Sequence, residues 1–280
     1  MRGSTNIPVT SSNSGCVSHS EAGIPHIWTD ENGAHVRLLG HDFADMDLQK
    51  VVGCLVDRPA GDSFAYVVTP NADHLVRLAR NPALHPLYAD AWMRLLDSRV
   101  VAQLGRVLGL PVPEVVPGSD LTAYLVEHEI GADEPVAVLG LTPEALEALV
   151  ARTGLRRIAH HNPPMGFEHD AAEFERAVRF IEEHPARFTF LAVGSPRQCM
   201  VANALVKRGR ATGIGLCIGA SLLFLTGEER RAPAMVQKFG MEWAWRLAQD
   251  PKRLAQRYLV DSPAIIALLR QEARERRVSA

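Results

Sequence analysis

The sequence of 280 residues lacks the cysteine patterns of disulfide-bonded and zinc-binding proteins. It has four cysteines, none of them arranged as Cys-x-x-Cys. It also lacks an N-terminal signal pattern and any apolar run near the roughly 20 residues that cross a bilayer. With 30 basic and 32 acidic residues, its formal net charge of -2 gives no broad positive field for nucleic acid. We therefore expect a protein of a reducing compartment that neither binds nucleic acid nor is an integral membrane protein.

Several motifs of common enzyme classes are absent too. There is no Walker A motif, no complete Gly-x-Gly-x-x-Gly after a predicted strand, no Gly-x-Ser-x-Gly and no His-Glu-x-x-His. These absences disfavour nucleoside triphosphate hydrolysis, a standard dinucleotide site, the common type of serine hydrolase and a zinc protease. We find no Asp-x-Asp pair near the end of any predicted strand, and we interpret the paired His160 and His161 as structural or surface residues. A metal site is therefore not expected.

Short apolar runs alternate with amphipathic segments over most of the chain. Strands buried on both faces are predicted at 36–39, 65–68, 92–96, 136–139, 157–160, 188–193 and 214–218. Helices are predicted at about 46–57, 71–80, 99–109, 119–129, 143–153, 170–183 and 197–208. This alternation predicts an α/β protein with a mainly parallel, Rossmann-like sheet flanked by helices and a helical C-terminal appendage.

Composition divides the chain into three parts. Residues 1–30 are rich in serine, threonine, asparagine and glycine, and they predict a disordered leader. Residues 31–226 form the predicted α/β core, whose two halves meet near 111–135. The stretch 111–118, interrupted by prolines, is compatible with a joint between the halves, with the wall of a cleft or with a plain surface loop.

Residues 227–280 form the predicted helical appendage, and their charge differs in sign from the rest. From Thr226 onward there are 11 basic and 7 acidic residues, a balance of +4, whereas the chain before it carries -6. Asp250 followed by Pro251 predicts a helix start. Trp243 and Trp245, interleaved with arginines, suit an interface with a partner subunit or with lipid headgroups, or a helix packed on the core.

Polar side chains follow two of the predicted strands. Thr69 and Asn71 come after the strand at 65–68, and Asp97 comes after the strand at 92–96. Each residue could cap the helix that follows it. Ligands of parallel α/β sheets bind beyond the carboxyl ends of the strands, so the same residues are also candidates for contact with a polar substrate. Asp97 could then accept a proton from a substrate hydroxyl.

Glycine turns follow three other predicted strands, at Gly140, Gly194 and Gly219. Each turn leads toward the N-terminus of a predicted helix, where backbone N–H groups favour anions such as phosphate. Such turns also occur for purely structural reasons, but three along one edge of a sheet favour a ligand that carries phosphate.

A series of short segments occurs in a characteristic order and spacing. They are Thr69-Pro70-Asn71, Ala89-Asp90-Ala91 with Asp97, Val100-Val101, Pro113-Glu114, Gly118-Ser119-Asp120-Leu121, Pro163-Pro164-Met165-Gly166-Phe167, Gly194-Ser195-Pro196-Arg197-Gln198, Gly219-Ala220, Arg231-Ala232-Pro233, Glu242-Trp243, Arg246-Leu247, Pro251, Arg253-Leu254 and Arg257-Tyr258. Over about residues 35–260, this pattern resembles the WecG/TagA/CpsF family of bacterial glycosyltransferases, glycosyltransferase family 26.

The resemblance implies an inverting glycosyltransferase that moves a sugar from a UDP-sugar to a polyprenyl-pyrophosphate-linked saccharide in surface polysaccharide synthesis. It implies that Asp97 is the base and that Thr69 and Asn71 belong to the same pocket. The residues that we expect to bind the nucleotide sugar are Gly140, Gly194, Pro196, Gln198 and Gly219. Those expected to meet the diphosphate of the acceptor are Arg231, Arg246, Arg253 and Arg257. We expect no metal cofactor.

The resemblance also implies a division of labour along the chain. Residues 31–226 would be catalytic, and residues 227–280 would bind the membrane and the acceptor. The expected location is cytoplasmic, peripherally at the inner face of the plasma membrane. The donor sugar, the acceptor glycan and the oligomeric state, including a homo-oligomer, are left open.

The chain departs from the family pattern at four places. Ser98-Arg99 stands where a glycine usually follows the aspartate, Val115 where an arginine is common, Cys199 where a glutamate is usual and Leu223 where an aspartate is usual. These departures motivate an alternative function, a catalytically weakened protein that binds nucleotide sugars or assists assembly. An NAD(P)-dependent oxidoreductase is disfavoured because the dinucleotide fingerprint is missing.

Overall fold

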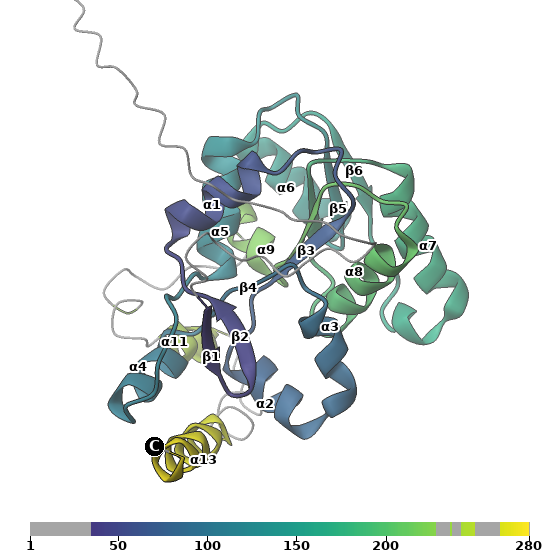
Figure 1. Ribbon diagram of the computed structural model, residues 1–280. Helices are drawn as coiled ribbons and strands as arrows, with labels where there is room; N and C mark the ends of the chain where they lie inside the picture. Colours follow the sequence, from purple (N-terminus) through teal and green to yellow (C-terminus); the bar gives the residue numbers. More distant parts are fainter. Residues whose placement is uncertain (1–34, 228–235, 237–241, 250–263, 280) are drawn as a thin grey trace, which may run out of the picture.

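The computed structural model describes residues 35–227, 236, 242–249 and 264–279. Its main sheet has six parallel strands in the order β4-β3-β8-β7-β5-β6 (Figure 1). The strands are β3 (Ala65–Val68), β4 (Met93–Arg94), β5 (Val136–Leu139), β6 (Ile158–His161), β7 (Phe188–Leu191) and β8 (Ile214–Cys217). The predicted α/β fold, with a mainly parallel sheet flanked by helices, is confirmed.

Helices cover both faces of this sheet. One face packs against α1 (Leu48–Asp57), α5 (Gly118–Tyr124), α6 (Pro143–Thr153) and α9 (Ser221–Thr226). The core cluster on the other face includes residues of α2 (Ala72–Arg80), α3 (His85–Ala89), α4 (Arg99–Val107), α7 (Ala171–Glu183), α8 (Arg197–Arg208) and α13 (Ala264–Val278). Within it, α13 contacts α2 and α4. The remaining described helices are η1 (Pro82–Leu84), η2 (Leu125–Glu129), η3 (Phe167–His169) and α11 (Glu242–Gln249).

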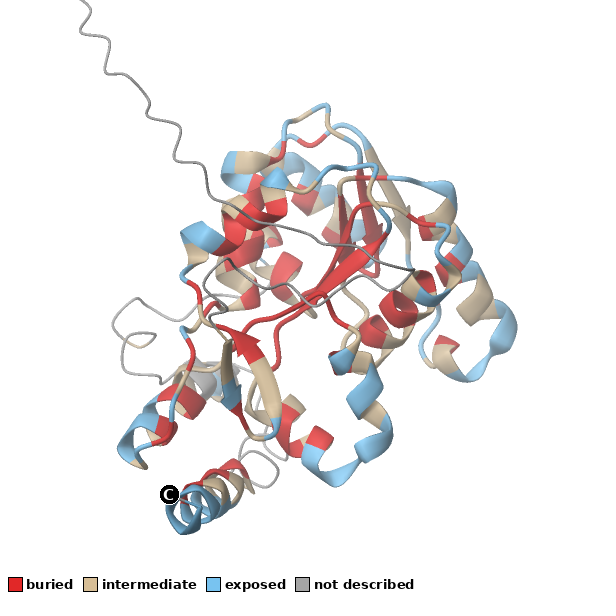
Figure 2. Cartoon of the chain, in the orientation of Figure 1, coloured by how far each residue is buried: buried red, intermediate tan, exposed pale blue. Residues whose placement is uncertain are grey.

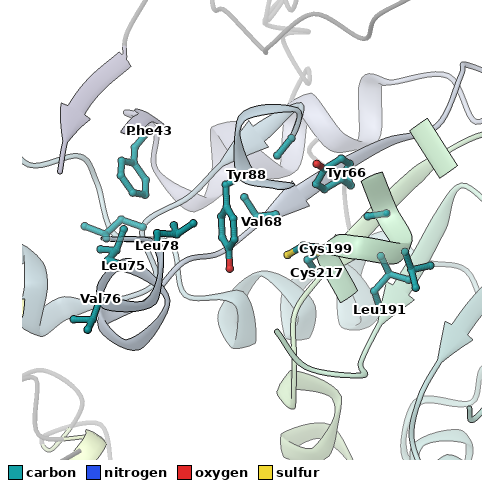
Figure 3. Packing of buried hydrophobic residues seen from close by; sticks show 14 of the residues in the cluster. Phe43, Tyr66, Val68, Leu75, Val76, Leu78, Tyr88, Leu191, Cys199 and Cys217 are labelled. Carbon is teal, nitrogen blue, oxygen red and sulfur yellow. The ribbon is translucent and has the colours of Figure 1, made fainter. Parts of the chain in front are cut away.

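The four central strands, β3, β8, β7 and β5, are buried on both sides because each side meets a layer of helices. In β3, Ala65 and Val67 belong to one core cluster, whereas Tyr66 and Val68 belong to the other. Figure 2 shows the strands at the centre of the sheet as a continuous buried layer. Figure 3 shows Tyr66 and Val68 in the second cluster, near the sulfur atoms of Cys199 and Cys217. The prediction of doubly buried strands is confirmed for β3, β4, β5, β7 and β8, but it was wrong for the edge strand β6, whose four residues are all half-buried.

The pairing of one predicted strand and the length of another were also wrong. The run at 36–39 belongs to an antiparallel hairpin, β1 (His35–Leu38) with β2 (His41–Ala44), which is a separate two-stranded sheet. β2 escaped prediction because its four residues, two polar followed by two apolar, form neither an apolar run nor an alternating pattern. The run at 92–96 yields only the two residues of β4, and Leu96 instead forms an isolated bridge with Val115.

The last helix packs on the core. Ile265 and Leu269 of α13 are fully buried in the cluster that also holds residues of α2 and α4. The Glu272 carboxylate accepts a hydrogen bond of 2.7 Å from the Leu39 backbone N–H, which ties α13 to the end of β1. Among the described helices, none combines the length and the apolar character that a membrane crossing requires.

The neighbouring strands β5 and β7 send the chain to opposite faces of the sheet. β5 leads into α6, which packs in one core cluster, and β7 leads into α8, which packs in the other. Such a reversal is the topological switch point at which ligands of open α/β sheets bind. The fold therefore directs attention to the loops after β5 and β7.

Candidate functional site

Parallel pairing places the carboxyl ends of all six strands at one edge of the sheet. The predicted site residues that follow these ends are Thr69 and Asn71 after β3, Asp97 after β4, Gly140 after β5, Gly194, Pro196 and Gln198 after β7, and Gly219 after β8. The sequence analysis therefore identified five loops on one edge.

Asp97 lies directly beside the loop that follows β3. Its backbone N–H donates to the Pro70 carbonyl at 3.0 Å, and the residue is half-buried. The reading in which Asp97 caps α4 was wrong: the cap is Ser98, whose hydroxyl accepts from the Val101 N–H at 3.2 Å. Both residue types are good caps, and the chain uses the second. The Asp97 carboxylate thus stands one residue before the capping position.

Thr69 and Asn71 have different roles in the same loop. The Asn71 side chain accepts from the His74 N–H at 3.3 Å, so its predicted capping role is confirmed. Thr69 is 6 % exposed, and its hydroxyl donates to the Cys217 carbonyl at 3.4 Å. A Cβ added to Gly118 would stand 2.8 Å from the Thr69 oxygen, so α5 begins in contact with this side chain. Thr69 joins the ends of β3 and β8 rather than capping a helix.

The glycines after β5 and β7 are required by the backbone. Gly140 has φ +106° and Gly194 has φ +78°, both in the left-handed region. A Cβ on Gly140 would lie 2.9 Å from the Ala192 carbonyl carbon and oxygen. The two loops of the switch point are therefore in close contact, and a side chain at position 140 would meet the Ala192 backbone and the Val193 side chain.

Gln198 and Gly219 are joined to each other. The Gln198 carboxamide oxygen accepts from the Gly219 N–H at 3.0 Å, and the residue is 2 % exposed. Pro196 precedes α8, whose N-terminus has no side-chain cap, whereas Thr142 caps α6 by accepting from the Ala145 N–H. Of these helices, α8 keeps the more open N-terminus.

The sequence analysis missed the residues that connect the loops after β3 and β7. Arg77 donates to the Ser195 carbonyl at 3.0 Å, and the Tyr88 hydroxyl lies 3.1 Å from the Ser195 hydroxyl. Burial raises the pKa of Tyr88 well above its ordinary value, so the phenol stays protonated. No local pattern reveals these pairs, because their partners are more than 100 residues apart.

Two departures from the family pattern lie beside Asp97. Val115 bridges Leu96, which precedes Asp97, and the Val116 N–H donates to the Leu96 carbonyl at 3.0 Å. Arg99, two residues after Asp97, forms an ion pair of 3.4 Å with Asp120. A guanidinium group is thus present here at position 99 although position 115 has none.

The other two departures lie in the protein interior. Cys199 is 1 % exposed in the cluster that contains α8, and Leu223 packs partly buried against the opposite cluster. Burial raises the pKa of the nearby Cys217 thiol well above its usual range.

One statement about metals was wrong. Asp45-Met46-Asp47 is an Asp-x-Asp pair, and it directly follows β2, a strand that the sequence did not reveal. Both carboxylates have backbone partners: Asp45 accepts from the Glu114 N–H at 2.9 Å, and Asp47 caps α1 by accepting from the Lys50 N–H at 2.9 Å. Within the described residues, no group of three or more histidine, cysteine or acidic side chains could hold a metal ion.

A hollow of about 600 Å³ lies between β6 and α7. His160 and His161 line it, together with Arg176, Arg179 and Phe180. A ring nitrogen of His160 lies 2.8 Å from the Gly140 carbonyl, and burial lowers the pKa of His161. The hollow contains none of the predicted site residues.

The predicted acceptor residues fall mostly outside the described residues. Arg231, Arg253 and Arg257 lie there, as do the leader at 1–30 and the helix start at Asp250. Arg246 belongs to α11, but its side chain is not among those described, and the same holds for Trp243.

Comparison with known proteins adds a family and several relatives. The family model described as "Glycosyl transferase WecG/TagA/CpsF family" matches residues 36–279. Curated proteins of Staphylococcus aureus strains MW2 and NCTC 8325 / PS 47 are each 25% identical over 229 residues, covering 80% of this chain and 88% of theirs. Both are called "N-acetylglucosaminyldiphosphoundecaprenol N-acetyl-beta-D-mannosaminyltransferase".

Proposed function

Because this chain belongs to the WecG/TagA/CpsF family and is a glycosyltransferase, we propose that it transfers a sugar from a UDP-sugar to a lipid-diphosphate-linked saccharide with inversion. The names of its relatives make N-acetylmannosamine the first donor sugar to test and a diphosphate-linked N-acetylglucosamine the first acceptor. The observation that carries this proposal is the common sheet edge, where Asp97, Thr69 and the switch-point loops all follow strand ends.

In the proposed reaction, Asp97 is the general base. An acceptor hydroxyl attacks the anomeric carbon of the donor, and its proton passes to the Asp97 carboxylate. The bond between the anomeric carbon and the phosphate oxygen breaks, and UDP leaves with the bonding electron pair. The hydrogen bond from the Asp97 N–H to Pro70 fixes the base beside the Thr69 and Asn71 loop. General-base catalysis of this kind contributes roughly 10²–10⁴-fold.

The donor is proposed to bind at the loops after β5 and β7, without a metal cofactor. Gly140 and Gly194 expose backbone at the switch point, and α8 begins there with no side-chain cap. Gln198 holds the Gly219 turn next to them. The Asp-x-Asp pair at 45 and 47 is engaged with backbone N–H groups, which supports a reaction independent of divalent ions.

The direct test is transfer by the purified chain. UDP-N-acetylmannosamine and N-acetylglucosamine-diphosphoundecaprenol should give a disaccharide-lipid product by mass spectrometry, with and without EDTA. GDP- and dTDP-sugars serve as matched alternative donors. Donor binding without any transfer to a lipid-linked acceptor would contradict the enzyme proposal and support the nucleotide-sugar-binding alternative. Loss of transfer in EDTA, restored by magnesium or manganese, would contradict the metal-independent part.

We also propose that the C-terminal part brings the enzyme to the cytoplasmic face of the membrane, where a lipid-linked acceptor resides. The three exposed arginines Arg270, Arg274 and Arg277 of α13 support this, because their spacing places them along one side of the helix. Within the described residues, no hydrogen bond or ion pair occupies these three guanidinium groups. Arginine side chains in such a stripe attract anionic lipid headgroups at about 1 kcal/mol each.

Co-sedimentation with vesicles tests the membrane proposal. Vesicles with phosphatidylglycerol should retain the wild-type chain at low salt and release it as salt rises, whereas pure phosphatidylcholine should not. Replacing Arg270, Arg274 and Arg277 by glutamine should weaken retention. The double variant Arg176→Gln/Arg179→Gln on α7 is the matched control, and equal loss in both variants would contradict a specific role for α13.

A further inference from the structure

Two arginines from distant parts of the chain converge on the loop after β7. Arg77 of α2 donates from Nη1 to the Ser195 carbonyl at 3.0 Å. Arg197, the first residue of α8, folds back over the same loop, and its Nη2 lies 3.3 Å from the position that a Cβ on Gly194 would take. Both guanidinium groups therefore lie against the two-residue stretch Gly194-Ser195.

Arg197 also spans the switch point. Its Nη1 donates to the sulfur of Met165 at 2.8 Å, and its Nε lies 3.9 Å from the Glu168 carboxylate. Met165 and Glu168 follow β6, whereas Arg197 follows β7, and β5 lies between these two strands in the sheet. The Arg197 side chain consequently links the loop after β7 to the segment after β6.

Arg77 approaches from the opposite side. It belongs to the connection between β3 and β4, and β8 separates β3 from β7 in the sheet. The Asp73 carboxylate pairs with Nη2 of Arg77 at 2.7 Å and orients the guanidinium toward Ser195. The Ser195 hydroxyl is held in turn by the Tyr88 hydroxyl at 3.1 Å. The two cations thus flank the loop from its two neighbouring sides.

The contacts of Arg197 leave hydrogen-bonding capacity for an anion. A guanidinium group has five N–H donors, and a thioether sulfur is a weak acceptor that a phosphate oxygen can displace. Within the described part of the chain, Nη2 of Arg197 donates no hydrogen bond. The Arg197 and Arg77 side chains are 23% and 36% exposed, so a bound anion would interact with partly desolvated charges. Gly194 has no side chain to keep a ligand away from the backbone.

We propose that Arg77 and Arg197 form a clamp for the diphosphate of the nucleotide-sugar donor. The clamp rests on the proposed function and extends it by naming the cations that stabilise the leaving group. As the bond from the anomeric carbon to the phosphate oxygen breaks, the electron pair stays on that oxygen, and the guanidinium N–H groups donate to the diphosphate. The proton of the acceptor hydroxyl goes to Asp97, so the clamp takes no part in proton transfer.

Calorimetric titration of the full-length chain tests the clamp with three probes: UDP, inorganic pyrophosphate and uridine. Arg197→Gln and Arg77→Gln should each weaken UDP and pyrophosphate binding by roughly tenfold or more, the loss expected for a hydrogen bond between charged groups. Uridine binding should stay unchanged in both variants. The ligand-free unfolding temperature should stay unchanged in Arg197→Gln and fall slightly in Arg77→Gln, which also loses its contacts with Ser195 and Asp73. Arg106→Gln, which changes an exposed arginine on α4, is the matched control and should behave as wild type.

Kinetics add a second measurement. In both glutamine variants the KM for the donor should rise and kcat should fall, while the KM for the acceptor stays constant, and Arg197→Lys should recover part of kcat. Unchanged affinity for UDP and pyrophosphate in both variants would overturn the clamp. An equal loss of uridine binding would also overturn the clamp, because it would show that the two arginines support the folded structure rather than bind the diphosphate. If the wild type transfers no sugar but its pyrophosphate binding depends on both arginines, the proposed function fails and the diphosphate site remains.

Discussion

The two sides of the candidate site differ in whether side chains or backbone groups form them. On the side of β3 and β4, side chains carry the chemistry: Asn71 caps a helix, Thr69 bonds to the end of β8, and Asp97 lies beside them. On the side of β5 and β7, glycines with positive φ expose backbone. The positive charge there belongs to arginines of neighbouring helices that lie against the loop after β7. The first side suits proton transfer to a side chain, and the second suits a large anion that needs room.

The two sides are also joined. Arg77 and Tyr88 belong to the connection between β3 and β4, yet both hydrogen-bond to Ser195 after β7. A change at these contacts should therefore affect both sides of the site. Variants of residues outside them should separate catalysis from donor binding, and the following predictions use that separation.

The largest effect is expected for Asp97→Asn. Loss of the base should lower kcat by roughly 10²–10⁴-fold, while UDP affinity stays near the wild-type value. Steady-state kinetics and calorimetry measure the two quantities separately. Asp133→Asn, which changes an exposed carboxylate paired with Arg156, is the control. Wild-type turnover in Asp97→Asn would remove this residue from catalysis, and a parallel loss of UDP binding would show that the two sides are one unit.

The next effect concerns the glycines of the switch point. In Gly140→Ala, the new methyl group would lie 2.9 Å from the Ala192 backbone at φ +106°, so we expect a loss of roughly 1–3 kcal/mol in unfolding free energy, with weakened UDP binding. In Gly194→Ala the nearest atom is the flexible end of Arg197, at 3.3 Å, so the loss should be smaller.

Urea denaturation and UDP titration measure both glycine variants. Gly53→Ala is the control, because Gly53 lies inside α1 with no atom within 4 Å of the new methyl group and should gain stability. Equal stability of Gly140→Ala and wild type would show that the two loops move apart readily, against the rigid donor side described here.

The smallest expected effect concerns the pH dependence of the unfolding free energy, which we attribute in part to the side of β3 and β4. Burial first, and then His85, Arg94 and Arg37, lower the pKa of His41 to about 4. Below pH 6.5 the His41 ring binds a proton in the unfolded chain, whereas in the native chain it does so only near pH 4. The free energy of unfolding therefore falls as pH drops through this range. His41→Gln should flatten that fall by about 1 kcal/mol.

Urea midpoints from pH 7 to pH 4 measure the His41 effect. His128→Gln, a change of an exposed histidine on η2, is the matched variant and should leave the slope unaltered. A slope equal to wild type in His41→Gln would place the pH dependence in other groups.

Local signals in the sequence predicted much of this fold. The bounds of α6 and α8 were correct, since Thr142 caps α6 and a left-handed glycine ends each helix, Gly154 and Gly209. β2 was missed because His-Asp-Phe-Ala is neither an apolar run nor an alternating pattern, and α3 was missed because five residues are too few to show a helical period. In the site, strand ends located Thr69, Asn71 and Asp97, but the choice of Ser98 over Asp97 as cap depends on one residue of backbone register.

Side-chain contacts across the sheet could not be predicted from local patterns in the sequence. Arg77 looks like an ordinary helix residue, and only the packing of α2 beside the β7 loop brings it to Ser195. Arg197 was noticed only as part of a matching segment, and its reach toward Met165 depends on the strand order.

The packing of α13 has a consequence for biosynthesis. Ile265 and Leu269 fill space against α2 and α4, the helices that begin beside Asn71 and Asp97, yet they are translated after every strand of the main sheet. The nascent chain can assemble its sheet early, but the hydrophobic layer under these two helices is completed only after residues 264–273 have left the ribosome. A stop codon between Gly227 and Ala264 would therefore yield a chain with its whole sheet but with an uncovered apolar surface on α2 and α4.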